Sequence, residues 1–293
     1  MGLFNGYLKE GPGVSKDAPE KHRFFLFFEL FGRKFTRLIQ LNLLFFVCLI
    51  PIIIGLYTSF GFNPNLFTDG AVNMEVLKTQ PLIQLSGDIV GLVIYILSLF
   101  ITGPAIAGFT YVIRNFQRQE HAWVMSDFKD NFKSNFKQAT ILAFIDSVVY
   151  FLLYVAFVFY TYALPAHSSP LTNFAPMLTA VIVVIAIVYT WMHYYIYVMM
   201  VTFDLRLKDI MRNALIFALG KLPLNVMITL ICGAIVIASV IFNTVIGIIL
   251  SAIITLSLIG YIIVFSVYPT IENYLIAPVS VPDDEEDIAD FCD

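Results

Sequence analysis

The sequence predicts an all-α polytopic membrane protein with six transmembrane helices, both termini in the cytoplasm and amphipathic helices at the cytoplasmic surface. Three observations lead to this fold class: the composition, the recurrence of long apolar blocks and the placement of Lys and Arg. The chain has 293 residues, of which 59% are hydrophobic and 13% are charged, and its mean hydropathy is +0.84. A soluble domain carries about 25% charged residues, so this composition excludes an ordinary soluble protein.

Apolar blocks long enough to cross a bilayer recur along the chain. The last block, 222–268, would reach about 70 Å as one helix, against a hydrocarbon core of roughly 30 Å, so it must turn back near 242–244. The first block starts too late for a cleavable signal peptide and lacks a small-residue cleavage site. The expected spans are 41–58, 89–113, 139–164, 177–201, 222–242 and 244–268.

The positive charges set the expected orientation. Of the 17 Lys and Arg residues, only Lys78 falls on the side of the membrane opposite the termini, and the other 16 fall on the side that the termini share. Cytoplasmic loops carry the excess of Lys and Arg, so both termini are expected in the cytoplasm. The chain then divides into a cytoplasmic N-terminal segment with an interfacial helix (1–40), a six-helix transmembrane domain (41–268) and an acidic cytoplasmic tail (269–293).

The stretch FKDNFKSNFKQ, residues 128–138, is the most regular polar sequence in the chain. On an α-helix a period of four drifts by about 40° per step, so the phenylalanines share one narrow face and the lysines form a parallel stripe beside it. Ser126 suits the N-cap of such a helix, and Asp127 suits the positive end of its dipole. We expect a surface that docks a partner or lipid, made by Phe128, Lys129, Phe132, Lys133, Phe136 and Lys137.

Two interpretations of this surface are open. An interfacial support helix, or a straight extension of the third span, would place the lysines against anionic headgroups. A docking helix would use the same lysines to hold another subunit. Two further amphipathic elements are expected at the cytoplasmic surface, at 21–38 and 209–225.

Two ionisable residues, Asp146 and His193, fall inside the third and fourth expected spans. Both lie at a similar depth, counted from the cytoplasmic ends of their spans. An intramembrane carboxylate is costly without a partner, so the two are a candidate buried polar pair. The pair is either a structural hydrogen bond, with nearby tyrosines as further partners, or a proton relay. Asn42, Asn225 and Asn243 are expected to link helices.

Gly103 and Pro104 mark a candidate helix break in the second span, because a proline removes a helical hydrogen bond. No Walker A, Gly-x-Ser-x-Gly, His-Glu-x-x-His or dinucleotide motif is present. The cysteines are not placed for a disulfide or a metal site, and the basic residues form no basic domain. We therefore expect a protein that is not an enzyme and binds no cofactor, metal or nucleic acid.

Three stretches carry a resemblance to a known family. They are MGLFNGYLKEGPGVSKDAPEKHRFFLFFELFGRKFTRLIQLNLLF, TGPAIAGFTYVIRNFQRQEHAWVMSDFKDNFKSNFKQ and IMRNALIFALGKLP. They resemble the YesL-like family of bacterial membrane proteins, a domain of unknown function, over most of 1–225. The resemblance implies a plasma membrane protein of a Gram-positive bacterium, typically encoded beside carbohydrate ABC importers and glycan-degrading enzymes. It implies no catalytic residues.

Two hypotheses of function follow. The first is a non-enzymatic accessory membrane subunit of a carbohydrate ABC importer, whose partners are the lipid bilayer and the importer's permease subunits. The alternative is an independent ion- or proton-coupled carrier that uses Asp146 and His193. An importer permease is disfavoured, because NALIFALGKLPLN has the glycine and the Leu-Pro of the permease motif but lacks its Glu-Ala-Ala start.

Overall fold

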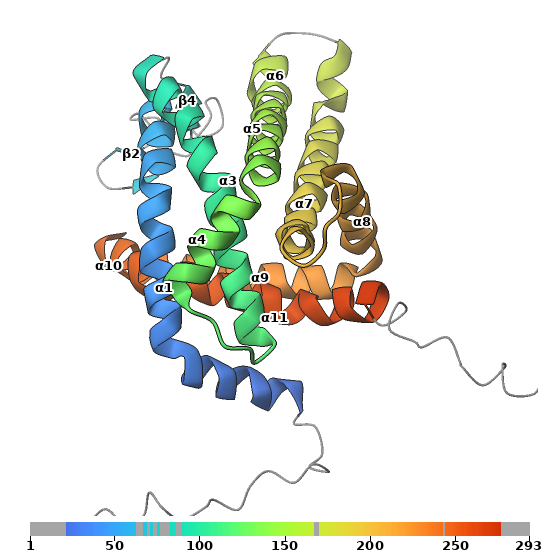
Figure 1. Cartoon of the computed structure of the whole chain (residues 1–293). Coiled ribbons are helices and arrows are strands. Elements are labelled where there is room, and N and C mark those ends of the chain that lie inside the picture. The colour runs from blue at the N-terminus through green and yellow to red at the C-terminus, as the bar shows by residue number, and fades with distance from the viewer. Residues whose placement is uncertain are drawn as a thin grey trace, which may run out of the picture. The chain divides into compact units, whose positions relative to one another are not determined.

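The structure is a computed structural model that describes residues 22–62, 67–68, 71–72, 75–76, 83–85, 89–166, 170–242 and 244–276. It divides into two units, Met1–Phe35 and Thr36–Asp293, which are described separately. The α-helices in the described ranges are α1 (Arg23–Ser59), α3 (Ile89–Gln117), α4 (Val124–Ser134), α5 (Phe136–Val158), α6 (Leu164–Ala166), α7 (Ala175–Met200), α8 (Leu207–Gly220), α9 (Leu222–Phe242), α10 (Thr244–Leu250) and α11 (Leu256–Ile271) (Figure 1). Shorter helical segments continue or precede them: the π-helices η3 (Phe159–Ala163), η5 (Ser251–Thr255) and η6 (Glu272–Ile276), and the 3-10 helix η4 (Pro170–Phe174).

Six helical stretches in the described residues are long and apolar enough to cross a membrane, as expected for a multi-pass membrane protein. Two helices extend beyond the expected spans. The N-terminal helix expected at 21–38 and the span expected at 41–58 are parts of one helix, α1, and the last helical stretch continues to Ile276. The six stretches are Arg23–Ser59, Ile89–Gln117, Phe136–Ala163, Pro170–Met200, Leu222–Ser239 and Ser251–Ile276.

The all-α fold also contains short strand pairs in the segment between α1 and α3. There, β1 (Phe60–Phe62) pairs antiparallel with β4 (Ile83–Leu85), and β2 (Phe67–Thr68) pairs with β3 (Ala71–Val72). The β1–β4 ladder places Phe60 opposite Leu85. Aromatic and β-branched side chains favour such pairing, and the ladder joins the end of α1 to the start of α3.

Glycines allow the helices around α3 to approach closely. A Cβ on Gly108 would lie 2.6 Å from the backbone oxygen of Phe128 in α4, and a Cβ on Gly103 would collide with the backbone of Ala139 in α5. On the α11 side, a Cβ on Gly260 would meet the ring of Phe109. Small residues at helix contacts are the usual means of close packing in membranes, and they make α3 the helix on which α4, α5 and α11 pack.

The helix break expected at Gly103 and Pro104 is not present, because α3 continues as an α-helix from Ile89 to Gln117. Pro104 has no N–H to donate, but the turn before it is held by a hydrogen bond of 3.0 Å from the Thr102 hydroxyl to the Ser98 carbonyl. Helices in membranes accept proline when hydroxyl groups and neighbouring helices support the turn, and α5 packs tightly here against Gly103.

Two asparagines link helices through backbone groups. The Asn42 amide of α1, which is fully buried, donates to the carbonyls of Ser251 and Ala252 at 2.8 and 2.6 Å and accepts from Ser257 N–H at 2.7 Å. These partners lie in and just after η5, where the wider π-helical turn leaves backbone groups for an outside partner. Asn42 therefore replaces part of the missing backbone hydrogen bonding.

Asn225 of α9 plays the matching part at the end of α8. Its amide donates to the Phe217 and Ala218 carbonyls at 3.4 and 2.9 Å, and its side-chain oxygen accepts from the Tyr195 hydroxyl at 2.8 Å. The last carbonyls of a helix lack partners within it, so Asn225 caps α8 and ties it to α7. Asn243 lies outside the described residues.

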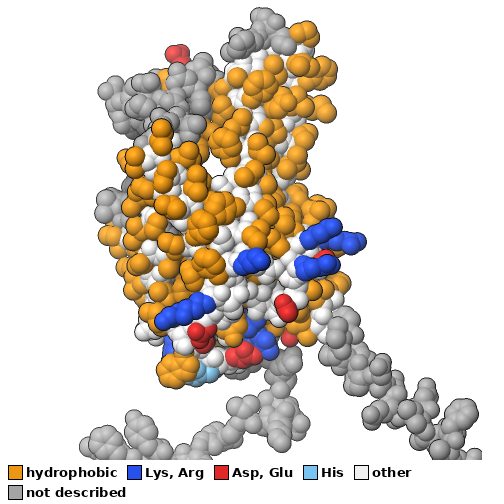
Figure 2. Space-filling view, turned by 45° about the horizontal axis from the view of Figure 1, so that its top comes forward, with side chains coloured by type: hydrophobic (Ala, Val, Ile, Leu, Met, Phe, Trp, Pro, Cys, Tyr) orange, Lys and Arg blue, Asp and Glu red, His pale blue; other side chains and the backbone are white. Residues whose placement is uncertain are grey.

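The helices of the second unit do not share one direction. Figure 1 shows α9 and α11 side by side, running across the direction of α5 and α7. On the face shown in Figure 2, hydrophobic side chains cover most of the described surface, and most of the charged side chains gather toward one end. An apolar belt with charge at its edge is the surface expected of a protein in a bilayer.

Candidate functional site

Helix α4 contains most of the FKDNFKSNFKQ motif, and its start differs from the expected one. The helix begins at Val124, and the Asp127 carboxylate accepts a hydrogen bond of 2.9 Å from Trp123 N–H. The expected cap, Ser126, instead donates to the Asp130 carboxylate at 3.3 Å. Ser126 is the third residue inside the helix, so its hydroxyl is too late in the sequence to cap the first turn.

The three phenylalanines of the motif form a ladder whose burial decreases along the chain. Ring centroids are 6.4 Å apart for Phe128 and Phe132 and 6.0 Å apart for Phe132 and Phe136. Phe128 is 5% exposed and packs on Gly108 of α3, whereas Phe136 is 40% exposed. The apolar face is thus anchored to the chain's own helix α3 at its first phenylalanine.

The motif is not one straight helix. Asn135 separates α4 from α5, with φ −94° and ψ 7°, and Figure 1 shows α4 leaving the direction of α5. The simple extension of the third span is therefore interrupted, and Phe136 and Lys137 belong to the first turn of α5. The backbone hydrogen bonds from Asn135 N–H to Asn131 and from Ala139 N–H to Asn135 keep the two helices in register.

The lysine stripe remains exposed. Lys129, Lys133 and Lys137 are all solvent-accessible, and within the described part of the chain none of them forms an ion pair. Because Phe128 holds α4 to α3, the stripe is carried on a fixed support. The geometry suits contact with an anionic surface, either lipid headgroups or acidic side chains.

The structure brings Asp146 of α5 and His193 of α7 together. His193 Nε2 lies 2.9 Å from Asp146 Oδ1, and the Tyr189 hydroxyl donates to the same carboxylate oxygen at 2.6 Å. The side chains of His193 and Asp146 are 19% and 16% exposed. We call Asp146, His193 and Tyr189 the acid cluster.

The hydrogen bonds of the acid cluster place one proton on His193. His193 Nδ1 lies 2.9 Å from the Tyr189 carbonyl oxygen, which can only accept, so Nδ1 carries a hydrogen. Nε2 lies 2.9 Å from Asp146 Oδ1 but has no hydrogen-bond partner among the described residues, so the two side chains form an ion pair when the imidazole carries a second proton.

Tyrosines surround the imidazole of the acid cluster. The rings of Tyr189, Tyr150 and Tyr197 lie 4.9, 6.1 and 6.5 Å from the His193 ring, centroid to centroid. The Tyr150 hydroxyl lies 3.3 Å from the Thr190 hydroxyl rather than on the acid cluster. A proton leaving the pair has Tyr189 as its direct hydrogen-bonded neighbour.

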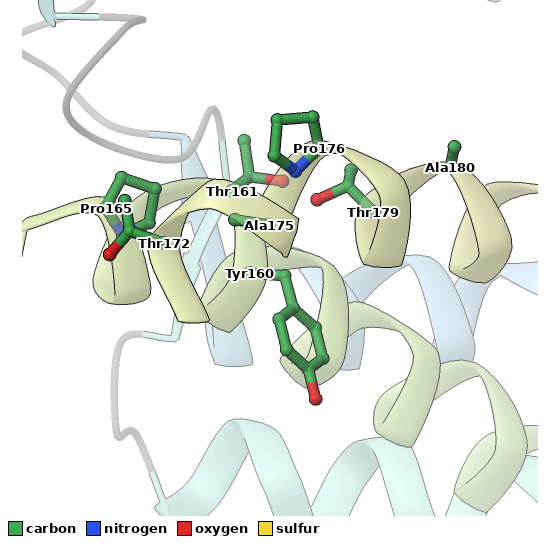
Figure 3. Close-up of a pocket in the computed structure, with 8 residues that line it drawn as sticks. All are labelled: Tyr160, Thr161, Pro165, Thr172, Ala175, Pro176, Thr179 and Ala180. Carbon is green, nitrogen blue, oxygen red and sulfur yellow. The ribbon is translucent and has the colours of Figure 1, made fainter. Parts of the chain in front are cut away.

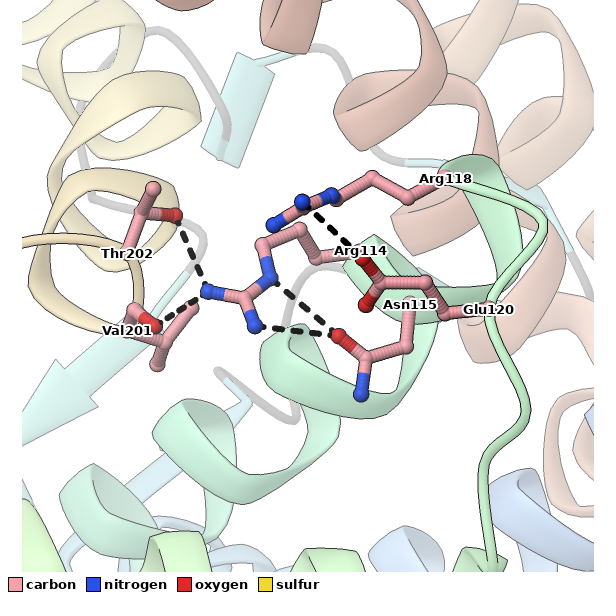
Figure 4. Close-up of polar contacts among 6 residues, drawn as sticks. All are labelled: Arg114, Asn115, Arg118, Glu120, Val201 and Thr202. Atoms are coloured by element: carbon pink, nitrogen blue, oxygen red, sulfur yellow. Dashed lines mark hydrogen bonds and ion pairs between the residues drawn. The ribbon is translucent and has the colours of Figure 1, made fainter. Parts of the chain in front are cut away.

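Arg114, near the end of α3, is a buried charge rather than an exposed flanking cation. Its side chain donates to Asn115, to the Val201 carbonyl and to the Thr202 hydroxyl, and the residue is 7% exposed (Figure 4). Val201 follows the last residue of α7, so the guanidinium neutralises the negative end of that helix. Neighbouring Arg118 forms an ion pair with Glu120. No sequence motif marks this contact, because Arg114 and Val201 are far apart in the chain.

Two hollows lie among the candidate spans. One, of about 590 Å³, lies between η3–α6 and η4–α7, and in it the Thr161 and Thr179 hydroxyls point toward one another (Figure 3). The Thr161 hydroxyl oxygen has no hydrogen-bond partner among the described residues. The other, of about 830 Å³, lies between α1, α3 and α5, and Tyr150 is part of its wall.

No group of three or more His, Cys, Asp or Glu side chains able to hold a metal occurs in the ranges that the structure describes. The acid cluster offers one carboxylate and one imidazole, and Cys48 and Cys232 are free thiols elsewhere. Structural zinc sites need four ligands, so this donor set does not suit one.

A family model described as "Protein of unknown function, DUF624" matches residues 76–157. The matched range holds α3, α4 and nearly all of α5, and so includes the motif and Asp146 but not His193. This match is consistent with the resemblance to the YesL-like family. Neither the curated proteins nor the solved structures contain a match.

Proposed function

We propose that this chain is a non-enzymatic accessory membrane subunit that binds or stabilises a carbohydrate ABC importer, in a bacterial plasma membrane with both termini in the cytoplasm. The observation that carries the proposal is α4: its first phenylalanine is buried on α3, while its lysines stay exposed without an ion-pair partner among the described residues. A stripe of cations on a rigid support favours a docking surface, because little side-chain and backbone order is lost on binding.

The orientation in this proposal rests on the charge asymmetry of the sequence. The loop that carries α4 and the loop that carries α8 hold most of the basic residues between the spans. The positive-inside rule places such loops in the cytoplasm, where an importer's ATPase and the cytoplasmic ends of its permease are found. A cysteine replacing Ser126 should therefore resist an impermeant thiol reagent in intact cells, and one replacing Thr68 should react.

The docking role is tested by removing only the charge of the stripe. The triple variant Lys129→Gln, Lys133→Gln and Lys137→Gln keeps helix propensity but loses the attraction to an anionic partner, which is worth about 1 kcal/mol per lysine near an anionic surface. The tagged chain is purified from its native membrane in a mild detergent, and importer permease subunits are identified by mass spectrometry. We expect the wild-type chain to retain them and the triple variant to lose them.

The matched control removes three charges from the start of α8. Arg206→Gln, Lys208→Gln and Arg212→Gln alter exposed side chains, one of which forms a surface ion pair with Asp209. Surface pairs contribute little to stability, so this variant should keep both its fold and its partner. If the wild-type chain retains no permease subunit in several mild detergents, the accessory-subunit proposal is wrong. If both triple variants keep the partner, the importer is bound by another surface.

A second candidate function is a proton-coupled carrier, which the acid cluster favours. Its three ionisable side chains lie in contact within candidate spans, where such residues commonly serve proton relays. In proteoliposomes with an internal pH dye, a carrier should move protons when its substrate is added from a panel of sugars. Asp146→Asn should abolish this flux while the chain remains folded. Proton flux in the wild type that survives Asp146→Asn would remove the acid cluster from the mechanism.

A further inference from the structure

The larger hollow is a wedge formed because α3 and α5 diverge. At Gly103 and Ala139 the two helices touch backbone to backbone. Farther along, by about 12 Å at the helical rise, the gap is bridged by a long side chain: the Tyr95 hydroxyl donates to the Ser147 hydroxyl at 2.9 Å. The wedge therefore opens away from α4.

Helix α1 closes one side of the wedge and makes it a groove. A Cβ on Gly55 would lie 2.6 Å from the Tyr95 backbone, so α1 and α3 are locked together along this edge. The third wall is α5, with Val148 and Leu152 57% and 59% exposed. The cavity of about 830 Å³ thus has preformed walls on two sides, and exposed apolar side chains on the third. We call this cavity the α1–α3–α5 groove.

The polar groups of the groove leave its interior apolar. The Tyr95 and Ser147 hydroxyls satisfy each other, and the Tyr150 hydroxyl lies near Thr190 of α7. At the wide end, the rings of Phe60 and Tyr154 meet at 6.1 Å. Tyr57 lines the same end and is 73% exposed. Aromatic side chains of this kind mark the level of the lipid headgroups.

The length of the groove matches one leaflet. Its positions on α5 run from Phe144 to Tyr154, which is about 15 Å at the rise of an α-helix. Half of a hydrocarbon core of roughly 30 Å is also about 15 Å. On α1 and α3 the wide end of the groove coincides with the helix ends at Ser59 and Ile89, and the groove narrows toward Leu99, which is 4% exposed.

We propose that the α1–α3–α5 groove holds one acyl chain of a phospholipid from the leaflet remote from α4. Three features select this occupant. The interior is apolar, and the Tyr95, Ser147 and Tyr150 hydroxyls have partners. The mouth is aromatic and lies at headgroup level, and the depth is that of one leaflet. The groove differs from an ordinary lipid-facing surface in that two of its walls are fixed by backbone contacts. The chain should therefore keep this lipid when the rest of the bilayer is replaced by detergent.

The test compares two tryptophans on α5. Val148→Trp fills the groove, whereas Val155→Trp adds the same side chain at an exposed position that does not line it. Each full-length chain is purified in a mild detergent, washed, and examined by native mass spectrometry for retained phospholipid. We expect one lipid on the wild type and on Val155→Trp, and about a tenth of that occupancy or less on Val148→Trp, because each methylene excluded from the groove weakens binding several-fold.

Each other outcome overturns the proposal. No phospholipid on the wild type shows that the groove holds no specific lipid, and equal retention by Val148→Trp places the lipid elsewhere. A retained second copy of the chain, lost only in Val148→Trp, makes the groove an interface between copies. If Val148→Trp has a lowered melting temperature, Leu152→Phe fills the same wall with a smaller change and is measured in its place.

Discussion

The asparagine links and the acid cluster are two ways of placing polar groups inside the same membrane protein. Asn42 and Asn225 are fully buried and bind mainly backbone carbonyls at a π-helical turn or a helix end. The acid cluster lies between α5 and α7, with the side chains of His193 and Asp146 partly exposed, and its central contacts join ionisable side chains.

The difference separates a structural role from a candidate functional one. A backbone carbonyl cannot change its protonation, so the asparagine links have one stable arrangement. The acid cluster holds an imidazole and a carboxyl group in contact, and both are groups that can gain or lose a proton. Only a group with two accessible states can couple to a transported species, and the residues that carry this property are the ones to test for transport.

The largest expected effect is on the asparagine links. Asn42→Leu removes three hydrogen bonds and leaves two carbonyls and one N–H of the η5 region without that partner. Intramembrane hydrogen bonds are worth about 0.6–1.7 kcal/mol each, so we expect a loss of about 2–5 kcal/mol in the free energy of unfolding. An SDS titration in mixed micelles measures it. Cys48→Ala, on the same helix, is the control, and a loss no larger than that of the control would make the link dispensable.

The second effect concerns the close contact between α3 and α5 at Gly103 and Ala139. Gly103→Ala places a methyl group against the Ala139 backbone, which cannot yield as a flexible side chain does. Overpacking of this kind costs about 1–3 kcal/mol. Gly233→Ala is the matched control, because nothing lies within 4 Å of the added Cβ. The same SDS titration should show destabilisation only for Gly103→Ala, and equal values would mean that α3 and α5 separate easily.

The third effect is on the acid cluster itself and is read from a double-mutant cycle. Asp146→Asn keeps an acceptor for the Tyr189 hydroxyl and offers an amide donor to His193, so the fold should survive. We expect Asp146→Asn and His193→Gln to be non-additive by about 0.6–2 kcal/mol in unfolding free energy, as for other intramembrane pairs. Additive losses would show that the two side chains do not stabilise one another.

Much of the helical content could be predicted from the sequence, because long apolar blocks have few alternatives in a bilayer. The similar depth of Asp146 and His193 also followed from counting along two antiparallel spans, and the structure places the two side chains in contact. The prediction of a helix break at Gly103 and Pro104 was wrong. Local sequence does not reveal that Thr102 and the tightly packed α5 support the helical turn at this proline. The prediction of Ser126 as N-cap was wrong for a similar reason, since the helix starts earlier and the Asp127 carboxylate accepts from Trp123 N–H.

The contacts that sequence reasoning missed are long-range. Arg114 of α3 binds the end of α7, and Asn42 of α1 binds η5; these contacts join residues 87 and more than 200 positions apart in the chain. The groove was also not predicted, because it arises from the divergence of two helices rather than from a pattern in either. Periodicity assigns faces to a helix, but it does not give the angle at which two helices cross.

The smallest expected effect is that of Tyr150→Phe, and it is measured against the same substitution at Tyr195. Tyr195→Phe removes the donor to the buried Asn225 oxygen, whereas Tyr150→Phe removes a contact of 3.3 Å with Thr190, whose hydroxyl already donates to its own helix at Ala186. Leaving a buried acceptor unsatisfied costs about 1–3 kcal/mol, so Tyr195→Phe should destabilise measurably. Tyr150 is 41% exposed, and its loss should change the unfolding free energy by less than about 0.5 kcal/mol. Equal losses in the SDS titration would contradict the distinction, because they would mean that exposed and buried hydroxyls contribute alike. A small loss for Tyr150→Phe that also left proton flux unchanged would confine the mobile proton to Asp146, His193 and Tyr189.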